Sequence, residues 1–186
     1  MSLSGASWVR QYPTSTSTSD LTQPFRTRVE NFLSALQAAG ASVTIEATLR
    51  PPQRAYLMHY SFRIAREGLN PASVPALSGV DIQWVHMDAR NHPDLAASRA
   101  AASAMVSGFG IVFRPALKSL HTQGEAIDMD ISWSGDSLTI TGADGRAVTI
   151  RSRPHTGANP ELQRVGAGYL VYKLPTDPPH WSINGH

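Results

Sequence analysis

Two short segments of the chain carry residue types that could bind a metal ion. Residues 119–128 contain His121 and Asp128, and residues 177–181 contain His180. Imidazole nitrogen and carboxylate oxygen are common zinc ligands. The chain has no Cys, so a thiolate metal site, a Cys nucleophile and disulfides are all excluded.

The spacing of the first segment excludes one continuous helix as its scaffold. On such a helix His121 and Asp128 would lie about 10 Å apart along the axis, whereas zinc ligands sit about 2 Å from the ion. Gly124 interrupts a helix and permits a tight turn. We therefore expect a turn near Gly124 that folds His121 back toward a strand carrying Asp128.

Residues 125–132 alternate in character and predict that strand. Asp128 and Asp130 then share one face, while the apolar residues 127, 129 and 131 share the other and face the core. Two carboxylates on one face of a half-buried strand are costly unless a positive group lies near them. A zinc ion is one such group.

The second segment contains two prolines before His180. Proline excludes a helix interior and favours an extended, polyproline-like path that repeats every three residues. In that conformation Asp177 and His180 face the same way. His180 is then available as a third ligand, with Asp177 beside the metal.

The two segments, in this order and about fifty residues apart, resemble the zinc peptidases that include D-alanyl-D-alanine carboxypeptidases, vancomycin-resistance dipeptidases and phage L-alanyl-D-glutamate endolysins. The resemblance implies that His121, Asp128 and His180 bind one Zn²⁺ per chain. It implies that Asp177 is the general base. Arg50, at the end of an early strand, resembles the arginine that binds the substrate and steadies the charged intermediate.

The function implied is hydrolysis of the stem peptide of bacterial peptidoglycan by a zinc metallopeptidase. An Asp at the base position, followed by His-Trp, is more similar to the endolysin branch, which favours an L-Ala-D-Glu endopeptidase. The alternatives are a D,D-carboxypeptidase and a non-catalytic zinc module that binds wall peptide. Ser119, Asp130 and Trp181 are candidates for orienting a ligand or contacting the substrate.

Hydrophobic periodicity predicts the elements that position these residues. Helices are expected over 25–36, where Asp20 is the candidate N-cap, and over 52–68, 94–107 and 159–165. Strands are expected over 43–47, 80–86, 125–132 and 169–172, with a hairpin over 137–150. Together they predict an α+β fold: a small, mostly antiparallel sheet with helices packed on one side and zinc in a surface cleft. We expect an N-terminal arm over 1–19 and a single zinc peptidase catalytic domain over 20–186.

Composition and charge limit the classes of molecule that the chain is expected to bind. The formal charge is +2 and no run of Lys and Arg occurs, which argues against nucleic acid as the ligand. No apolar stretch is long enough to span a membrane, and a signal peptide is not evident. We expect a monomer made in the cytoplasm that acts in the periplasm or cell wall, after release through a holin or injection. A phage lysin, a secreted toxin and a tail component all fit this expectation.

Overall fold

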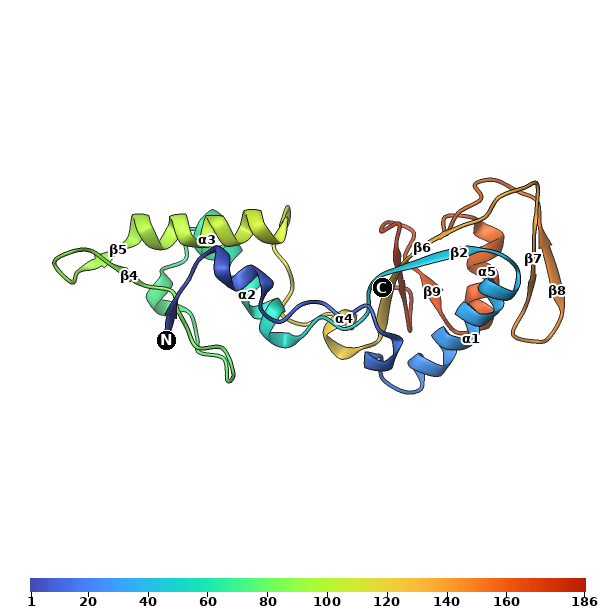
Figure 1. Cartoon of the computed structure of the whole chain (residues 1–186), viewed down its shortest axis with the longest axis horizontal. Helices are drawn as coiled ribbons and strands as arrows, with labels where there is room; N and C mark the ends of the chain where they lie inside the picture. The colour runs from blue at the N-terminus through green and yellow to red at the C-terminus, as the bar shows by residue number, and fades with distance from the viewer. The chain divides into compact units, whose positions relative to one another are not determined.

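The computed structural model describes all 186 residues, which divide into two compact units. Unit 1 is formed by Met1–Pro13 and Pro51–Ser119, and unit 2 by Thr14–Arg50 and Leu120–His186 (Figure 1). This division differs from the expected arm over 1–19 and single domain over 20–186. The first residues are structured, since Trp8 is buried in the core of unit 1. The fold is α+β, with mostly antiparallel strand pairs.

Unit 2 is built on a four-stranded sheet with the order β2-β6-β10-β9. Every neighbouring pair in this sheet is antiparallel. The strands are β2 (Ser42–Ala47), β6 (Ala126–Ser132), β9 (Tyr172–Lys173) and β10 (His180–Ser182). The expected strands over 43–47 and 125–132 are thereby confirmed, whereas β10 was not predicted.

Two helices of unit 2 cover the apolar face of this sheet. They are α1 (Phe25–Ala38) and α5 (Pro160–Gly168), and their buried residues join those of β6 in one hydrophobic cluster. Burial alternates along β6, where Ile127, Met129 and Ile131 are buried and Asp130 is exposed. The predicted division of β6 into an apolar and an acidic face is confirmed.

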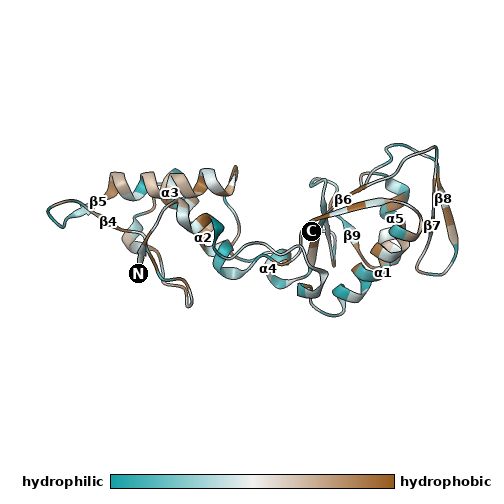
Figure 2. Cartoon of the chain, viewed as in Figure 1, coloured by the Kyte–Doolittle hydropathy of each residue, from teal (hydrophilic) through white to brown (hydrophobic).

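The remaining elements of unit 2 are short. The predicted hairpin is confirmed as β7 (Leu138–Thr141) and β8 (Ala147–Ile150), which carry brown, hydrophobic segments in Figure 2. A single helical turn, α4 (Leu120–Gln123), precedes β6, and a 3-10 turn, η2 (Thr18–Asp20), precedes α1. The prediction that Asp20 caps α1 is wrong. The helix begins at Phe25 after Pro24, and the Asp20 carboxylate accepts a hydrogen bond from Ser15 Oγ at 2.6 Å.

Unit 1 is mainly helical. Helices α2 (Pro52–Arg66) and α3 (Leu95–Phe109) pack against each other, and Asp94 caps α3 by accepting from the Ala97 amide at 2.8 Å. The expected strand over 80–86 is instead two short strands. The other elements of the unit are β1 (Ser2–Leu3), η1 (Ala6–Arg10), η3 (Pro71–Ser73), β3 (Ile82–Gln83), β4 (His86–Met87) and β5 (Pro93–Asp94). None of the chain's helices combines the length and apolar character that crossing a membrane requires.

The chain passes between the two units at three places, and the unit 2 residues next to two of these places are bonded to each other. The chain leaves unit 2 after Arg50 and returns at Leu120. The Arg50 amide donates to the His121 carbonyl at 3.0 Å. The end of the segment after β2 and the start of α4 are therefore fixed side by side.

Candidate metal centre

A row of residues across the sheet positions two of the predicted ligands. Asp128, on the central strand β6, lies opposite Ala47 of β2 and opposite His180 of β10. Residues directly opposite in an antiparallel pair project to the same face of the sheet. The strand register therefore brings Asp128 and His180 together from positions 52 residues apart in the chain.

The turn around Gly124 positions the third predicted ligand, His121. Helix α4 is a single turn, after which Gly124 takes φ +70° and the Glu125 amide donates to the Leu120 carbonyl at 2.9 Å. A Cβ at Gly124 would lie 3.0 Å from the Asp20 carbonyl oxygen, so glycine is required here for both conformation and space. The predicted turn that folds His121 back toward Asp128 is confirmed.

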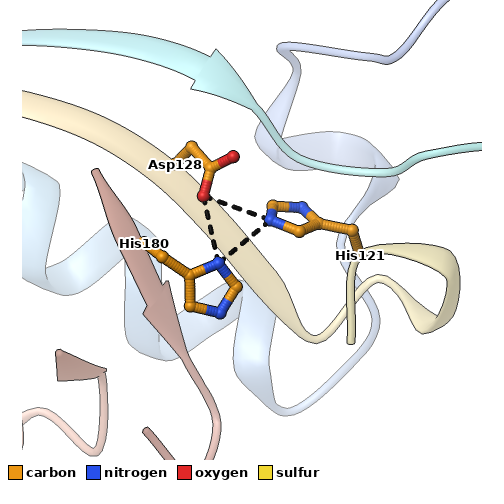
Figure 3. A group of neighbouring side chains, drawn as sticks. All are labelled: His121, Asp128 and His180. Carbon is orange, nitrogen blue, oxygen red and sulfur yellow. Dashed lines mark hydrogen bonds and ion pairs between the residues drawn. The ribbon is translucent and has the colours of Figure 1, made fainter. Parts of the chain in front are cut away.

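The three side chains converge on one point, as Figure 3 shows. His121 Nε2 lies 3.1 Å from Asp128 Oδ1 and 3.2 Å from His180 Nδ1, and His180 Nδ1 lies 3.1 Å from Asp128 Oδ1. The side chains are largely enclosed, with exposed fractions of 7% for His121, 19% for Asp128 and 10% for His180.

Hydrogen bonds on the outer side of each imidazole ring decide which nitrogen carries the proton. His121 Nδ1 lies 2.8 Å from the Thr48 carbonyl oxygen, and His180 Nε2 lies 3.1 Å from the His186 carbonyl oxygen. A carbonyl oxygen can only accept, so both outer nitrogens are donors. In the neutral rings, the inner nitrogens then present lone pairs to the same point as the Asp128 carboxylate.

Three acceptor atoms enclosed within 3.2 Å of one another repel unless a positive group lies among them. The charge distribution of the site reflects this need. Burial alone raises the pKa of Asp128, but when the inner nitrogens also carry protons, hydrogen bonds and charge from His121 and His180 outweigh burial and hold that pKa well below its usual range. Burial lowers the pKa of His180, yet the contacts with Asp128 and the His186 carbonyl raise it overall.

The donor set fits a metal ion. Ligand atoms about 2.0–2.1 Å from a tetrahedral zinc lie about 3.3 Å from one another, and the three separations in this site, 3.1–3.2 Å, are close to that distance. Both imidazoles also donate their outer N–H to a carbonyl, as metal-bound histidines generally do. His121, Asp128 and His180 could therefore hold a metal ion.

Asp177 lies in a turn immediately before His180. The Asp177 amide donates to the Leu174 carbonyl at 3.2 Å, and the His180 amide donates to the Asp177 carbonyl at 3.1 Å. The predicted extended polyproline path is therefore wrong, because a proline at the first central position of a turn favours closure equally well. The Asp177 side chain is exposed, and its charge contributes to the raised pKa of His180.

Lys173 fixes this turn. Its ammonium group donates to the carbonyls of Leu174 and Asp177, both at 2.5 Å, and of His180 at 3.2 Å. Burial lowers the pKa of Lys173, and the charges of Asp177 and Asp128 partly offset that effect. A single cation thus holds together the backbone that carries Asp177 and His180.

Arg50 lies next to the helix that carries His121. Its amide donates to the His121 carbonyl at 3.0 Å, and its side chain is half-buried. Its Nε is buried and has no hydrogen-bond partner, and the neighbouring Thr48 Oγ1 shares this property. A buried guanidinium nitrogen without an acceptor is costly, and an acceptor supplied by a bound ligand would offset that cost.

The three remaining predicted site residues, Trp181, Asp130 and Ser119, are not members of the His-Asp-His cluster. Trp181 is fully buried against Phe32 in the hydrophobic core, so its side chain is not accessible to a substrate. Asp130 is exposed and does not hold either ligand histidine. It borders a hollow of about 280 Å³ whose lining also includes Ser132, Thr156 and Pro178. Ser119 immediately precedes α4. A larger hollow, of about 420 Å³, lies between the β7–β8 hairpin and α5, and its lining includes none of the predicted site residues.

The groups that orient the histidines were missed by sequence reasoning. They are the backbone carbonyls of Thr48 and His186, together with the Lys173 ammonium group. A carbonyl is present in every residue, so no residue type could indicate the first two. Lys173 is one of only two lysines in the chain, and this rarity was the one available indication.

Fold and site together define an α+β protein with a largely buried His-Asp-His cluster that could hold a metal ion. Comparison of the chain with protein-family models, curated proteins and solved structures found no match.

Proposed function

We propose that the chain is a zinc-dependent peptidase that hydrolyses the stem peptide of bacterial peptidoglycan in the periplasm or cell wall. We favour cleavage of an L-Ala-D-Glu type bond. The observation that carries the proposal is the convergence of His121, Asp128 and His180, with both imidazole tautomers fixed toward the common point. Its further support is the order of the two motifs that supply these residues.

The chemistry proposed needs an open position at the metal. Three protein ligands leave a tetrahedral zinc ion such a position, which is typical of catalytic zinc sites. When bound, zinc would polarise the scissile carbonyl and lower the pKa of a water molecule. The ligand cluster is enclosed but not sealed, since Asp128 retains 19% of its side-chain exposure.

Asp177 is the proposed general base. Its carboxylate is exposed and belongs to the turn whose carbonyl accepts from the His180 amide. It is close enough to influence the pKa of His180, yet it is not a member of the ligand cluster. In this role it accepts a proton from the attacking water and transfers it to the leaving amine.

Arg50 is the proposed substrate-binding cation. Its buried Nε lacks an acceptor within the chain, and its backbone is bonded to that of His121. A guanidinium group there would bind the peptide carbonyl and stabilise the negative charge that develops on it.

The decisive experiment measures metal content and muropeptide hydrolysis on the same purified chain, with and without a chelator. About one zinc per chain and chelator-sensitive cleavage would support the proposal. Product masses would separate stem cleavage from loss of a terminal D-Ala. Zinc without cleavage would favour a wall-peptide binding module. A folded chain that binds no zinc, or prefers iron or manganese under competition, would contradict the proposal.

A further inference from the structure

The residues after β10 form a closed hook over the outer side of His180. This 182–186 hook comprises Ser182, Ile183, Asn184, Gly185 and His186. The Gly185 amide donates to Ser182 Oγ at 2.9 Å, and Ser182 Oγ donates to the His186 carbonyl at 3.0 Å. The His186 amide donates to Asn184 Oδ1 at 3.1 Å. Gly185 takes φ +80°, which allows the reversal.

The hook delivers its last carbonyl to the ligand ring. The His186 oxygen that accepts from Ser182 Oγ also lies 3.1 Å from His180 Nε2. Ser182 itself is fully buried and belongs to β10, two residues after His180. The position of the carbonyl is therefore set by a buried hydroxyl on the same strand as the ligand.

His121 and His180 differ in how the carbonyl that accepts from the outer ring nitrogen is held in place. Thr48, whose carbonyl fixes His121, is fully buried and its amide donates to the Ser15 carbonyl at 2.7 Å. His180 instead depends on a short loop that Ser182 and Asn184 hold in shape. A ring without this acceptor could place its proton on Nδ1, the nitrogen that faces Asp128 and His121, and would then be unable to bind a metal ion through that atom.

We propose that the 182–186 hook is a positioning device for the metal site: it fixes the tautomer and orientation of His180 and thereby sets the affinity for zinc. Ser182 and Asn184 are its positioning residues, and neither contacts the substrate or the reacting atoms. This inference rests on the proposed zinc site. Groups that orient a metal-bound histidine typically change metal affinity by about 10–100-fold when they are removed.

The test measures zinc affinity by competition with a chromophoric chelator, in the full chain. Ser182→Ala and Asn184→Ala are each expected to lower the affinity about 10-fold or more. Asn184→Asp retains the acceptor oxygen and should retain the affinity. Ser34→Ala, which removes an exposed serine hydroxyl of α1 bonded to the Glu30 carbonyl, is the matched control. Because Asn184 is exposed, its variants should fold even where Ser182→Ala does not.

A second readout separates positioning from general stability. In the zinc-loaded chain, nitrogen-15 spectra of the histidine rings should show a slowly exchanging Nε2–H on His180 in the wild type and a faster-exchanging Nε2–H in Asn184→Ala. Unchanged zinc affinity and an unchanged exchange rate of the His180 Nε2–H in Asn184→Ala would overturn the role of the hook while leaving the zinc site intact. A wild-type chain that binds no zinc would instead overturn the proposed function on which the inference rests.

Discussion

His121 Nε2 and His180 Nδ1 face each other at 3.2 Å, and each ring holds its other nitrogen against a backbone carbonyl. The two rings thus present different nitrogens to the common point, one distal and one proximal to Cβ. This asymmetry follows from their scaffolds, since His121 projects from a helical turn and His180 from a strand. Asp128 completes the triangle from the neighbouring strand.

Removal of the Asp128 charge should abolish zinc binding. Zinc at about 100 times its dissociation constant should stabilise the wild-type chain by about 2.7 kcal/mol, which raises Tm by about 5–10 °C for a chain of this size. Asp128→Asn should show no such rise. Thermal melts with and without zinc provide the measurement, and a full zinc-induced shift in Asp128→Asn would exclude this residue as a ligand.

The stability of the protein should respond to pH in opposite ways with and without metal. Without metal, the raised pKa of His180 stabilises the folded state below about pH 6.5, and this contribution disappears as pH rises through the folded-state pKa. The lowered pKa of Asp128 contributes above about pH 3.9, and its contribution disappears only in stronger acid.

Zinc binding requires deprotonated ligands, so the stabilisation that zinc provides should grow with pH. Between about pH 6 and 8, we expect the Tm of the metal-free chain to fall while the zinc-induced increase in Tm becomes larger. Melts at several pH values in chelator and in zinc measure both trends. Asp128→Asn should lose both the fall in Tm of the metal-free chain and the zinc-induced increase in Tm. A zinc-induced increase that stays constant over this pH range would contradict the ligand assignment.

Asp177→Asn separates catalysis from metal binding. Because Asp177 lies outside the ligand cluster, the variant should bind one zinc per chain with wild-type affinity. Its turnover of muropeptides should fall by about 10²–10⁴-fold, the usual contribution of a general base. Asp136→Asn, at an exposed carboxylate of the same unit, is the control. Wild-type turnover in Asp177→Asn would remove this residue from the mechanism.

Arg50→Met tests the proposed substrate-binding cation. Loss of a group that stabilises developing charge typically lowers kcat by about 10²–10³-fold, and zinc affinity should not change. Arg50→Lys should recover little activity, because an ammonium group lacks the planar fork of a guanidinium group. Arg151→Met, at an exposed arginine, controls for the loss of charge. If Arg50→Lys is fully active, only the charge matters and the guanidinium geometry does not.

Gly124→Ala should disturb both the turn and the metal site. The left-handed conformation costs a non-glycine residue about 1–2 kcal/mol, and the added Cβ would also crowd the Asp20 carbonyl at 3.0 Å. Gly135→Ala is a matched control, because Gly135 has φ +80° and open space around its Cβ position. Chemical denaturation should show a larger loss in Gly124→Ala, and zinc affinity should fall only in that variant. Equal losses of unfolding free energy in Gly124→Ala and Gly135→Ala would show that crowding of the added Cβ at position 124 is unimportant.

Periodicity predicted the two longest strands of the sheet and its covering helices because these elements bury one face continuously. The alternation along β6 and the apolar spacing of α1 are examples. Elements without such a pattern were missed. β10 is three residues long and follows two prolines, and α4 is a single turn. Both carry ligands, so the least periodic segments hold much of the site.

The candidate ligands could be selected from residue type and order, whereas their orientation could not. The carbonyls of Thr48 and His186 owe their roles to the path of the backbone, which the side chains at those positions do not reveal. The boundary between the units was equally hidden. Residues 50–51 and 119–120 carry no Gly- or Ser-rich linker that would mark a change of unit.

The hydrogen bond between the Arg50 amide and the His121 carbonyl closes the base of the whole 51–119 segment. Because this hydrogen bond holds its two ends together, the segment is comparable to an insertion between β2 and α4. A change in its length alters the entropy of loop closure only slightly. The sheet that carries the candidate ligands would keep its register. Exchange of residues 51–119 by recombination or engineering would also have to replace residues 1–13, because Trp8 is buried in the core of the same unit.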